Sequence, residues 1–340
     1  MNYKDIAQEA KKNIGPYCKV CPQCNGVACR GVIPGPGGKE TGIGFIRNYE
    51  AFRKVSLNMD TLYESKPIDC SIELFGKTFK YPFFAAPIGA VRLHYSDLYD
   101  DDTYSKAVLN GCYEAGIAAF TGDGINDQVF ELPLEFMEPL NGTGIPTIKP
   151  WENDEMIRKL KLAEEAGVMA VAMDIDSAGL SILADKGKPV SPKSMEDLKL
   201  IISQTELPVI LKGIMTIEGA RKAHEVGAAG IVVSNHGGRV LDEVPATLDV
   251  LPEIAKHYKG KMKIFIDGGV RSGADILKAI ALGADACLIG RPYVTAVYGG
   301  GQEGVEVYNG KVGKELEAAM LMTGASKLDE IEMHNIRLIK

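Results

Sequence analysis

Eight short apolar runs follow one another along residues 81–292, and a helical pattern of apolar positions comes after each of them. The runs are YPFFAAPIG (81–89), GIAAFTGDG (116–124), GIPTIKP (144–150), GVMAVAMDID (167–176), LPVILKG (207–213), AGIVVSNHGG (229–238), KIFIDGG (263–269) and ACLIGRP (286–292). Near-continuous apolarity is typical of parallel strands that are buried on both faces. Intervening segments such as SMEDLKLIISQT carry apolar residues at helical spacing. We therefore predict eight strand–helix units.

Eight such units over about 215 residues predict an α/β fold of the (β/α)8 TIM barrel type. A doubly wound open sheet is the alternative, but it usually has fewer strands and a glycine-rich turn after the first strand, where this chain reads PIGAV. Before the barrel, IAQEAKKNI predicts a short helix and ELFGKTFKYP a small hairpin. We expect an N-terminal extension over residues 1–80, with a cysteine-rich loop, and a barrel over residues 81–340.

Composition and charge mainly narrow the range of partners. Apolar residues make up 46% and charged residues 24% of the 340 residues, which is ordinary for a globular protein. The net charge of −7 argues against nucleic acid as a partner. No apolar stretch approaches the roughly 20 residues that span a bilayer, and the polar N-terminus has no signal-peptide core. We expect a cytoplasmic protein with neither a membrane nor a nucleic-acid partner.

Two glycine–arginine loops fall after the seventh and eighth predicted strands, where barrels commonly bind phosphate. The first contains Gly268, Gly269 and Arg271, and the second contains Gly290 and Arg291. Backbone N–H groups of glycine can approach an anion closely, and arginine adds charge. The alternative is that these glycines only form tight turns. We predict a phosphate site here.

Three further polar residues stand at the carboxyl ends of predicted strands, the end at which barrel active sites lie. His236 lies in SNHGGR, and Arg239 follows three residues later. A base beside an arginine suits proton removal from a substrate that carries a carboxylate. Lys212 would place a cation opposite a ring that accepts negative charge. The alternatives are a core histidine and a solvent-facing lysine.

These segments together resemble one known family. VSNHGGRVLDEVPATLDVLPEI, FIDGGVRSGADILKAIALGADACLIGRP, LPVILKG and FFAAPIGA are similar to the FMN-dependent α-hydroxy-acid oxidising enzymes, such as glycolate oxidase and lactate oxidase. The resemblance extends over about residues 80–330. It implies bound FMN, a small-molecule substrate and a homo-oligomer, with a tetramer as the expected form. It leaves the electron acceptor unidentified.

The resemblance also implies roles for individual residues. His236 matches the active-site base, Arg239 the arginine that binds the substrate carboxylate, and Asp174 the aspartate that pairs with the histidine. Lys212 matches the lysine beside flavin N1 and O2. The other positions that the resemblance assigns to FMN are Ala86, Pro87, Ile88, Gly89, Thr121, Lys149, Ser234, Asp267, Gly268, Gly269, Arg271, Gly290 and Arg291.

The substrate side of the family pattern is altered in this chain. DIDSAGLSIL lacks the second substrate arginine, and the lid loop is short because only 38 positions separate Asp174 from Lys212. Lys149 and Trp151 replace a glutamine and a tyrosine, and the N-terminal substrate tyrosine has no clear match. Lys149 would either hold flavin N5 or O4 or bind an acidic substrate group. We expect a larger substrate than the small hydroxy acids.

Three classes of function stay open at this stage. The resemblance favours an FMN-dependent oxidoreductase, in which His236 takes a proton from an α-hydroxy acid or related carboxylate and reducing equivalents reach flavin N5. The second class is a flavin-dependent isomerase without net redox. The third is a sensor whose flavin and cysteines report redox state without turnover.

Four cysteines crowd the segment YCKVCPQCNGVACRG at residues 17–31. The spacing C-x2-C-x2-C resembles that of iron–sulfur proteins, whereas two zinc knuckles would be cramped. Zinc, a thiol redox pair and a purely structural loop stay open, and a disulfide is weakly supported in a cytosolic chain. We predict a metal site close to the flavin, formed by Cys18, Cys21, Cys24 and Cys29. If Cys29 does not complete the site, Cys70, Cys112 or Cys287 would take its place.

Overall fold

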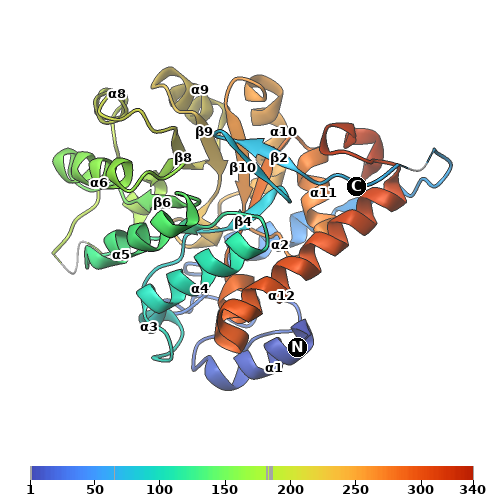
Figure 1. Cartoon of the computed structure of the whole chain (residues 1–340), viewed down its shortest axis with the longest axis horizontal. Helices are drawn as coiled ribbons and strands as arrows, with labels where there is room; N and C mark the ends of the chain where they lie inside the picture. The colour runs from blue at the N-terminus through green and yellow to red at the C-terminus, as the bar shows by residue number, and fades with distance from the viewer. Residues whose placement is uncertain (1, 65, 181–182, 184–186, 340) are drawn as a thin grey trace.

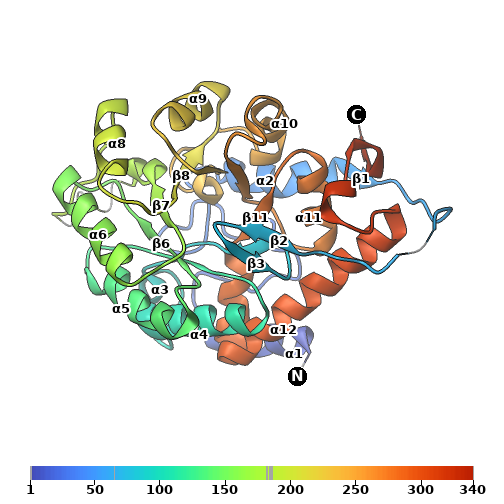
Figure 2. The ribbon, with the colours of Figure 1, turned by 45° about the horizontal axis from the view of Figure 1, so that its top comes forward.

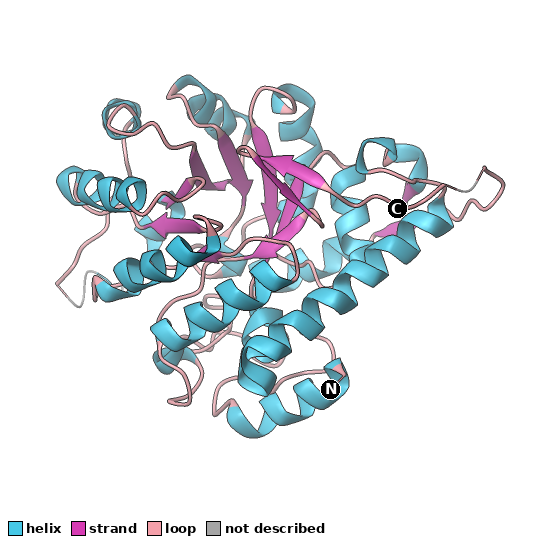
Figure 3. Cartoon of the chain, in the orientation of Figure 1, coloured by secondary structure: helices cyan, strands magenta, loops and turns pink. Residues whose placement is uncertain are grey.

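The computed structural model describes residues 2–64, 66–180, 183 and 187–339. Eight parallel strands stand at the centre with helices around them (Figures 1 and 3), and the predicted (β/α)8 barrel is confirmed. Pairing runs in the order β4-β11-β10-β9-β8-β7-β6-β5, and a bridge from Ala85 to Ala119 joins the two ends. The strands are β4 (Phe83–Ala85), β5 (Phe120–Thr121), β6 (Ile145–Ile148), β7 (Val171–Asp174), β8 (Val209–Ile214), β9 (Gly230–Val233), β10 (Lys263–Asp267) and β11 (Ala286–Ile289).

A helix follows each barrel strand, as the sequence predicted. In chain order from β4 to β11, these helices are α4 (Asp101–Glu114), α5 (Gln128–Met137), α6 (Asn153–Glu165), α8 (Met195–Ile202), α9 (Ile217–Glu225), α10 (Thr247–Tyr258), α11 (Gly273–Ala281) and α12 (Arg291–Thr323). Helix α12 bends at Gly300 and Gly301 and packs along α4 (Figure 1). None of the described helices is both long and apolar enough to cross a membrane.

Apolar side chains fill the barrel, so it is a packed core rather than a channel. The ring of Phe265 lies 5.8 Å from that of Phe120 and 6.3 Å from that of Phe84, centroid to centroid. All residues of β7, β9 and β11 are buried, which explains the near-continuous apolar runs in the sequence. The buried polar side chains of the strands lie toward their carboxyl ends, where the strands open to the loops.

The N-terminal segment wraps around the barrel (Figure 2). Helix α1 (Tyr3–Asn13), which the sequence predicted, packs against α12. The predicted hairpin is confirmed as β2 (Ile72–Leu74) and β3 (Lys77–Phe79). Strand β1 (Val55–Leu57) pairs with β12 (Ile336–Leu338), close to the other end of the chain. The division of the chain at residue 80 stays a prediction.

Helix α2 (Ile43–Arg53) holds the N-terminal segment over the carboxyl ends of the strands. The sequence analysis predicted no helix at these positions. The side chain of Asn48 donates to Asn235 Oδ1 at 2.7 Å and accepts from the backbone N–H of Thr247. These buried polar contacts fix α2 on the loop after β9. The loop that precedes α2, which includes the four cysteines, therefore lies beside the barrel mouth.

Candidate active site

A cavity of about 750 Å³ opens at the carboxyl ends of the strands. Its walls come from the barrel loops and from the N-terminal segment at Gly31–Glu40. Among the residues predicted for FMN and catalysis, those that line it are Ala86, Pro87, Ile88, Gly89, Lys149, Asp174, Lys212, His236, Arg239, Asp267, Gly268, Gly269, Arg271, Gly290 and Arg291. The two that do not are Thr121, which is buried at the end of β5, and Ser234, whose hydroxyl donates to Asp267.

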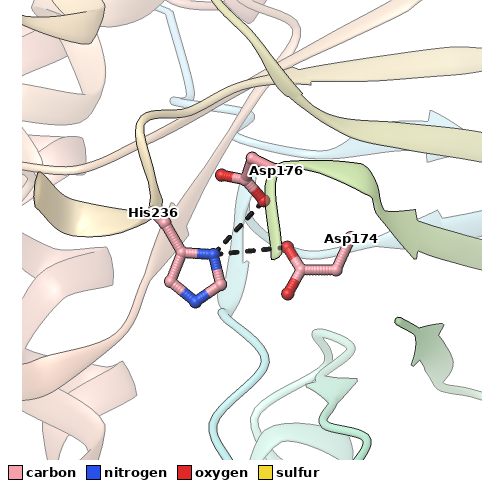
Figure 4. A group of neighbouring side chains, drawn as sticks. All are labelled: Asp174, Asp176 and His236. Carbon is pink, nitrogen blue, oxygen red and sulfur yellow. Dashed lines mark hydrogen bonds and ion pairs between the residues drawn. The ribbon is translucent and has the colours of Figure 1, made fainter. Parts of the chain in front are cut away.

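His236 is held by two aspartates rather than one (Figure 4). Its Nδ1 lies 3.2 Å from Asp176 Oδ1 and 3.5 Å from Asp174 Oδ1, while its other ring nitrogen points away from both carboxylates. The backbone of His236 has a φ of 55°, a left-handed conformation that is rare for a residue other than glycine. This turn after β9 aims the ring into the cavity. Asp176 is the last residue of the predicted strand GVMAVAMDID, and the sequence analysis assigned it no role.

Lys212 completes the charged group. Its Nζ donates to Asp174 Oδ1 at 2.7 Å and lies 3.8 Å from Asp176, and the lysine side chain is only 3% exposed. Burial acts to lower the pKa of Lys212, but Asp174 and Asp176 outweigh it and raise that pKa, so the side chain is a permanent cation. The ammonium occupies the position between the carboxylates, so this cluster of two aspartates and a histidine needs no metal ion for charge balance.

The protonation of the aspartates and the histidine follows from these contacts. Burial acts to raise the pKa of Asp174, but Lys212 and His236 outweigh it and hold that pKa well below its ordinary value. Burial raises the pKa of Asp176 despite the opposing Lys212 ammonium. Burial and Lys212 act to lower the pKa of His236, but the two carboxylates outweigh them and raise it. A raised pKa makes the imidazole a stronger base, which suits proton removal.

Arg239 faces the cavity without a carboxylate partner among the described residues. Its Nη1 donates to the backbone carbonyl oxygens of Gly35 and Gly37 at 2.7 and 3.0 Å. Burial, with the nearby Arg291 charge, lowers the pKa of Arg239 to about 10, so the guanidinium keeps its charge at neutral pH. Buried charges are normally paired. The free part of this guanidinium is therefore available to an anion in the cavity.

His94 lies beside Arg239 and was not singled out by the sequence analysis. Its Nδ1 accepts a hydrogen bond from the backbone N–H of Gly35 at 3.0 Å, and its Nε2 lies 3.4 Å from Arg239 Nη2. Burial, with the charges of Arg239 and Lys149, lowers the pKa of His94 to about 3, so the ring is neutral. Because Nδ1 is the acceptor, the single ring proton sits on Nε2. Two N–H donors, from His94 and Arg239, therefore face each other.

The glycine–arginine loops fit the phosphate end of FMN. Gly268 and Gly269 have φ values of 94° and 89°, and a Cβ on Gly269 would lie 2.0 Å from the carbonyl oxygen of Asn48. Only glycine therefore suits the turn, which brings two backbone N–H groups next to Arg271. Like Arg239, both Arg271 and Arg291 lack a carboxylate partner in the described part of the chain.

A buried hydroxyl group fits the ring end of FMN. Among the described residues, Thr121 Oγ1 and Thr147 Oγ1 are buried without a hydrogen-bond partner, but only Thr147 of the two lines the cavity. A buried hydroxyl usually has a partner, so that of Thr147 is free to bond a polar ring edge. Lys212 lies in the same cavity, where FMN would meet its positive charge. Residues for the ring and for the phosphate are thus present in one cavity.

Lys149 and Trp151 point in different directions. Lys149 Nζ lies 3.2 Å from Ser177 Oγ and 3.6 Å from Asp174 Oδ2, within the cavity wall. Trp151 does not line the cavity, because its indole N–H donates to Asp123 Oδ2 at 2.6 Å. Asp123 also accepts from Lys159 Nζ at 2.6 Å, and both of these side chains are fully buried. This ion pair anchors the loop after β5 to α6 at the wall of the cavity.

We expect replacement of Lys159 with methionine to lower the free energy of unfolding by about 3–5 kcal/mol, because Asp123 would be left as an unpaired buried charge. Urea unfolding of both proteins measures the change. The matched control is Arg221→Met, which removes an exposed pair with Glu218 on α9 and should have a much smaller effect. Equal effects of the two substitutions would contradict the anchoring role.

The four clustered cysteines surround a second, smaller cavity beside the first. Cys18, Cys21, Cys24 and Cys29 all line it, as predicted for a common site. The cysteines that the sequence left open as alternative members of that site are buried elsewhere in the core: Cys70, Cys112 and Cys287.

Fold and site together define a class of protein. A (β/α)8 barrel whose mouth combines two glycine–arginine loops, a lysine cation and a histidine held by aspartates fits a flavin-dependent oxidoreductase. The family profile of FMN-dependent dehydrogenases matches residues 35–186 and 187–338. The chain belongs to this FMN-dependent dehydrogenase family.

Individual relatives agree with the family. The chain is 31% identical to peroxisomal (S)-2-hydroxyacid oxidase GLO3 of Arabidopsis thaliana, over 88% of this chain and 90% of that protein. It is 28% identical to 4-hydroxymandelate oxidase of Amycolatopsis orientalis, over 92% and 96% of the two chains. Among solved structures, mandelate oxidase is similar with a TM-score of 0.83 and 26% identity, over 99% of this chain and 98% of that one. The predictions of an FMN enzyme and of its family are confirmed.

Proposed function

We propose that this enzyme oxidises an α-hydroxy acid with an apolar side chain to the corresponding 2-oxo acid. The observation that carries the proposal is the convergence of a base and a carboxylate-binding pair on one cavity: His236 on one side, and Arg239 with His94 on the other. The relatives named above include oxidases of 2-hydroxy acids, 4-hydroxymandelate and mandelate.

The carboxylate of the substrate would accept hydrogen bonds from Arg239 Nη2 and His94 Nε2. Two donors that face each other at 3.4 Å repel unless an acceptor lies close to both. A carboxylate oxygen supplies that acceptor, and its negative charge balances the Arg239 guanidinium. His94 would thereby replace the N-terminal tyrosine that the family pattern leads one to expect and that has no clear match here.

The side chain of the substrate would meet an apolar wall. Ile33, Leu93, Leu180 and Leu183 line the same cavity as the catalytic groups. Leu180 and Leu183 follow β7, where the sequence analysis noted a missing arginine and a short lid. That connection includes residues 181–182 and 184–186, which lie outside the described residues. An apolar wall in place of a second arginine favours a bulky, uncharged group over the hydrogen atom of glycolate.

The reaction begins with a proton that His236 accepts on Nε2, the nitrogen that points away from the aspartates. Asp174 and Asp176 stabilise the imidazolium that results, and they hold the ring in place through Nδ1. Lys212 keeps a positive charge in the cavity, where negative charge develops. FMN, when bound, accepts the reducing equivalents of the substrate.

Anaerobic mixing of the purified enzyme with a panel of hydroxy acids tests the proposal. We expect 2-hydroxy-4-methylpentanoate and mandelate to bleach the flavin faster than glycolate, with one 2-oxo acid formed per flavin. A product without net bleaching would instead identify an isomerase. No bleaching and no product would favour the redox sensor. Faster reaction with glycolate would contradict the apolar wall as the determinant of specificity.

The pH dependence of turnover should report the pKa of His236. The base must be neutral to accept a proton, so kcat/KM should rise with pH through a pKa above the ordinary histidine value of about 6.5. Asp176→Asn removes one of the carboxylates that raise this pKa. The acidic limb of the kcat/KM profile should therefore move to lower pH, and the value of kcat/KM on the plateau should fall. Asp249→Asn, an exposed position on α10, is the control. An unmoved limb in Asp176→Asn with normal FMN content would contradict the assignment.

We propose three further properties, which rest on the family resemblance and the sequence. The enzyme forms a homo-oligomer, with a tetramer as the expected form, and it works in the cytoplasm. Its cysteine loop holds a metal centre, either an iron–sulfur cluster or zinc. Light scattering after size-exclusion chromatography tests the first property, cell fractionation the second, and metal analysis the third.

A further inference from the structure

The cysteine loop forms a built cavity at the edge of the active site. Cys18, Cys21, Cys24 and Cys29 line it together with the side chains of Tyr95 and Arg291. The matched family region begins at residue 35, so the loop lies outside the segment that defines the family. The barrel fold and the flavin chemistry therefore leave four converging cysteines without an assigned role.

The spacing of the sulfur atoms separates a single ion from a cluster. Zinc holds four thiolates at about 2.3 Å, which places tetrahedral sulfurs about 3.8 Å apart. Among the described residues, which include all four cysteines, no three of these Sγ atoms lie within 4.8 Å of one another. In a [4Fe–4S] cubane each thiolate binds a different iron, so the sulfurs stand farther apart around a larger centre. Four cysteines around a cavity fit that arrangement better than a single ion.

The charge around the loop also fits an anionic cluster. Arg271 donates from Nε to the carbonyl oxygen of Cys24 at 3.0 Å, and its Nη2 lies 3.9 Å from Cys24 Sγ. The guanidinium of Arg291 lines the cysteine cavity and stacks on Phe45 at 3.6 Å from the ring centroid. A cubane with four thiolates carries net negative charge, which these arginines would balance. Within the described ranges of the chain, no acidic side chain lines the cysteine cavity.

The loop connects the active site to the surface. Tyr95 and Arg291 line both cavities, so one layer of side chains separates the cysteines from the active site. On its outer side the loop is exposed, and Val27 is 48% exposed between Cys24 and Cys29. An electron carrier in this loop would thus stand between the active site and solvent.

We infer that Cys18, Cys21, Cys24 and Cys29 hold a [4Fe–4S] cluster that carries electrons from the active site to an external one-electron acceptor. The inference rests on the proposed function, since oxidation of one hydroxy acid to a 2-oxo acid releases two electrons and two protons. The cluster changes by one electron at a time, so two electrons leave in succession and reduce two molecules of the acceptor. Of the two protons, one goes to His236 and then to solvent, and the other is released to solvent as the electrons leave the active site.

Iron and acid-labile sulfide analysis of the anaerobically purified protein tests the cluster directly. We expect about four irons and four sulfides per chain, and an electron paramagnetic resonance signal after reduction with dithionite. The double substitution Cys21→Ser, Cys24→Ser should lose iron and signal while FMN stays bound. The control Cys70→Ala changes a buried cysteine outside the loop and should keep the iron and the paramagnetic signal. A protein with zinc, or with neither metal, would overturn the inference, and this result does not depend on the folding of any variant.

Substrate reduction tests the electron path separately from the flavin chemistry. In the wild type, an anaerobic hydroxy acid should bleach the flavin and produce the cluster signal. In the double cysteine variant it should still bleach the flavin, but reduction of the acceptor cytochrome c should be lost. In His236→Ala the substrate should reduce neither centre, while dithionite still reduces the cluster. If the substrate bleaches the wild-type flavin without producing a cluster signal, electron transfer to the cluster is overturned and the proposed oxidation of a hydroxy acid still stands. If the substrate does not bleach the flavin, the proposed function itself is contradicted.

Discussion

Replacing His236 with alanine is expected to leave FMN bound and to slow flavin reduction by the substrate by about 10²-fold or more. The loss follows from the site geometry, because two aspartates hold Nδ1 of His236 and leave its other ring nitrogen free in the cavity. Among the other titratable groups nearby, the Lys212 ammonium is protonated, and the aspartates pair with it and with Lys149. Neither can replace a neutral imidazole as the base.

Stopped-flow reduction under anaerobic conditions measures this effect, with the FMN content of each protein determined from the released flavin. His257→Ala, an exposed histidine on α10, is the matched control and should reduce at the normal rate. Reduction by His236→Ala at a rate near that of the wild type would assign the proton transfer to another group.

Removal of the Arg239 guanidinium should have the second large effect. A hydrogen bond to a charged partner contributes about 1.5–3 kcal/mol, so Arg239→Met should lower kcat/KM by about 10- to 100-fold. Arg239→Lys should recover only part of the loss, because lysine lacks the planar fork of donors that suits a carboxylate. If the contact between Arg239 and the carboxylate is equally strong in the bound substrate and in the transition state, the loss in kcat/KM will appear mainly as a higher KM.

Arg239 also holds the carbonyl oxygens of Gly35 and Gly37, so its removal could act through the loop instead of the substrate. Substrate amides separate the two effects. If Arg239 binds the carboxylate, the substitution should penalise the hydroxy acid much more than the hydroxy amide. An equal penalty for both substrates would show that the arginine only positions the N-terminal loop.

The sequence was sufficient for the barrel and for the residues that belong to its motifs. The strands are buried on both faces, so each left an apolar run, and the polar residues that end the runs converge because parallel strands end at one mouth. His236, Arg239 and Lys212 could be found in this way. The short, irregular loops gave no comparable signal.

Residues that act through loop contacts were therefore missed. His94 becomes a donor toward the cavity only because Gly35, far away in sequence, takes its other nitrogen. Asp176 stood at a predicted strand end, but its contact with His236 depends on the turn of the chain after β7. The Asp123–Lys159 pair joins a loop to a helix, and no spacing in the sequence distinguishes it from an exposed pair.

The pairing of β1 with β12 has a consequence for biosynthesis. Strand β12 follows every barrel strand in the sequence, so the sheet that begins at Val55 is completed only when residues 336–338 have been made. Helix α1 likewise packs on α12, which follows every barrel strand, and β4 finds its partner in β11. Domains generally fold as units during synthesis. The barrel mouth of this unit can therefore be assembled, and a flavin bound there, only after the chain has been made through β12.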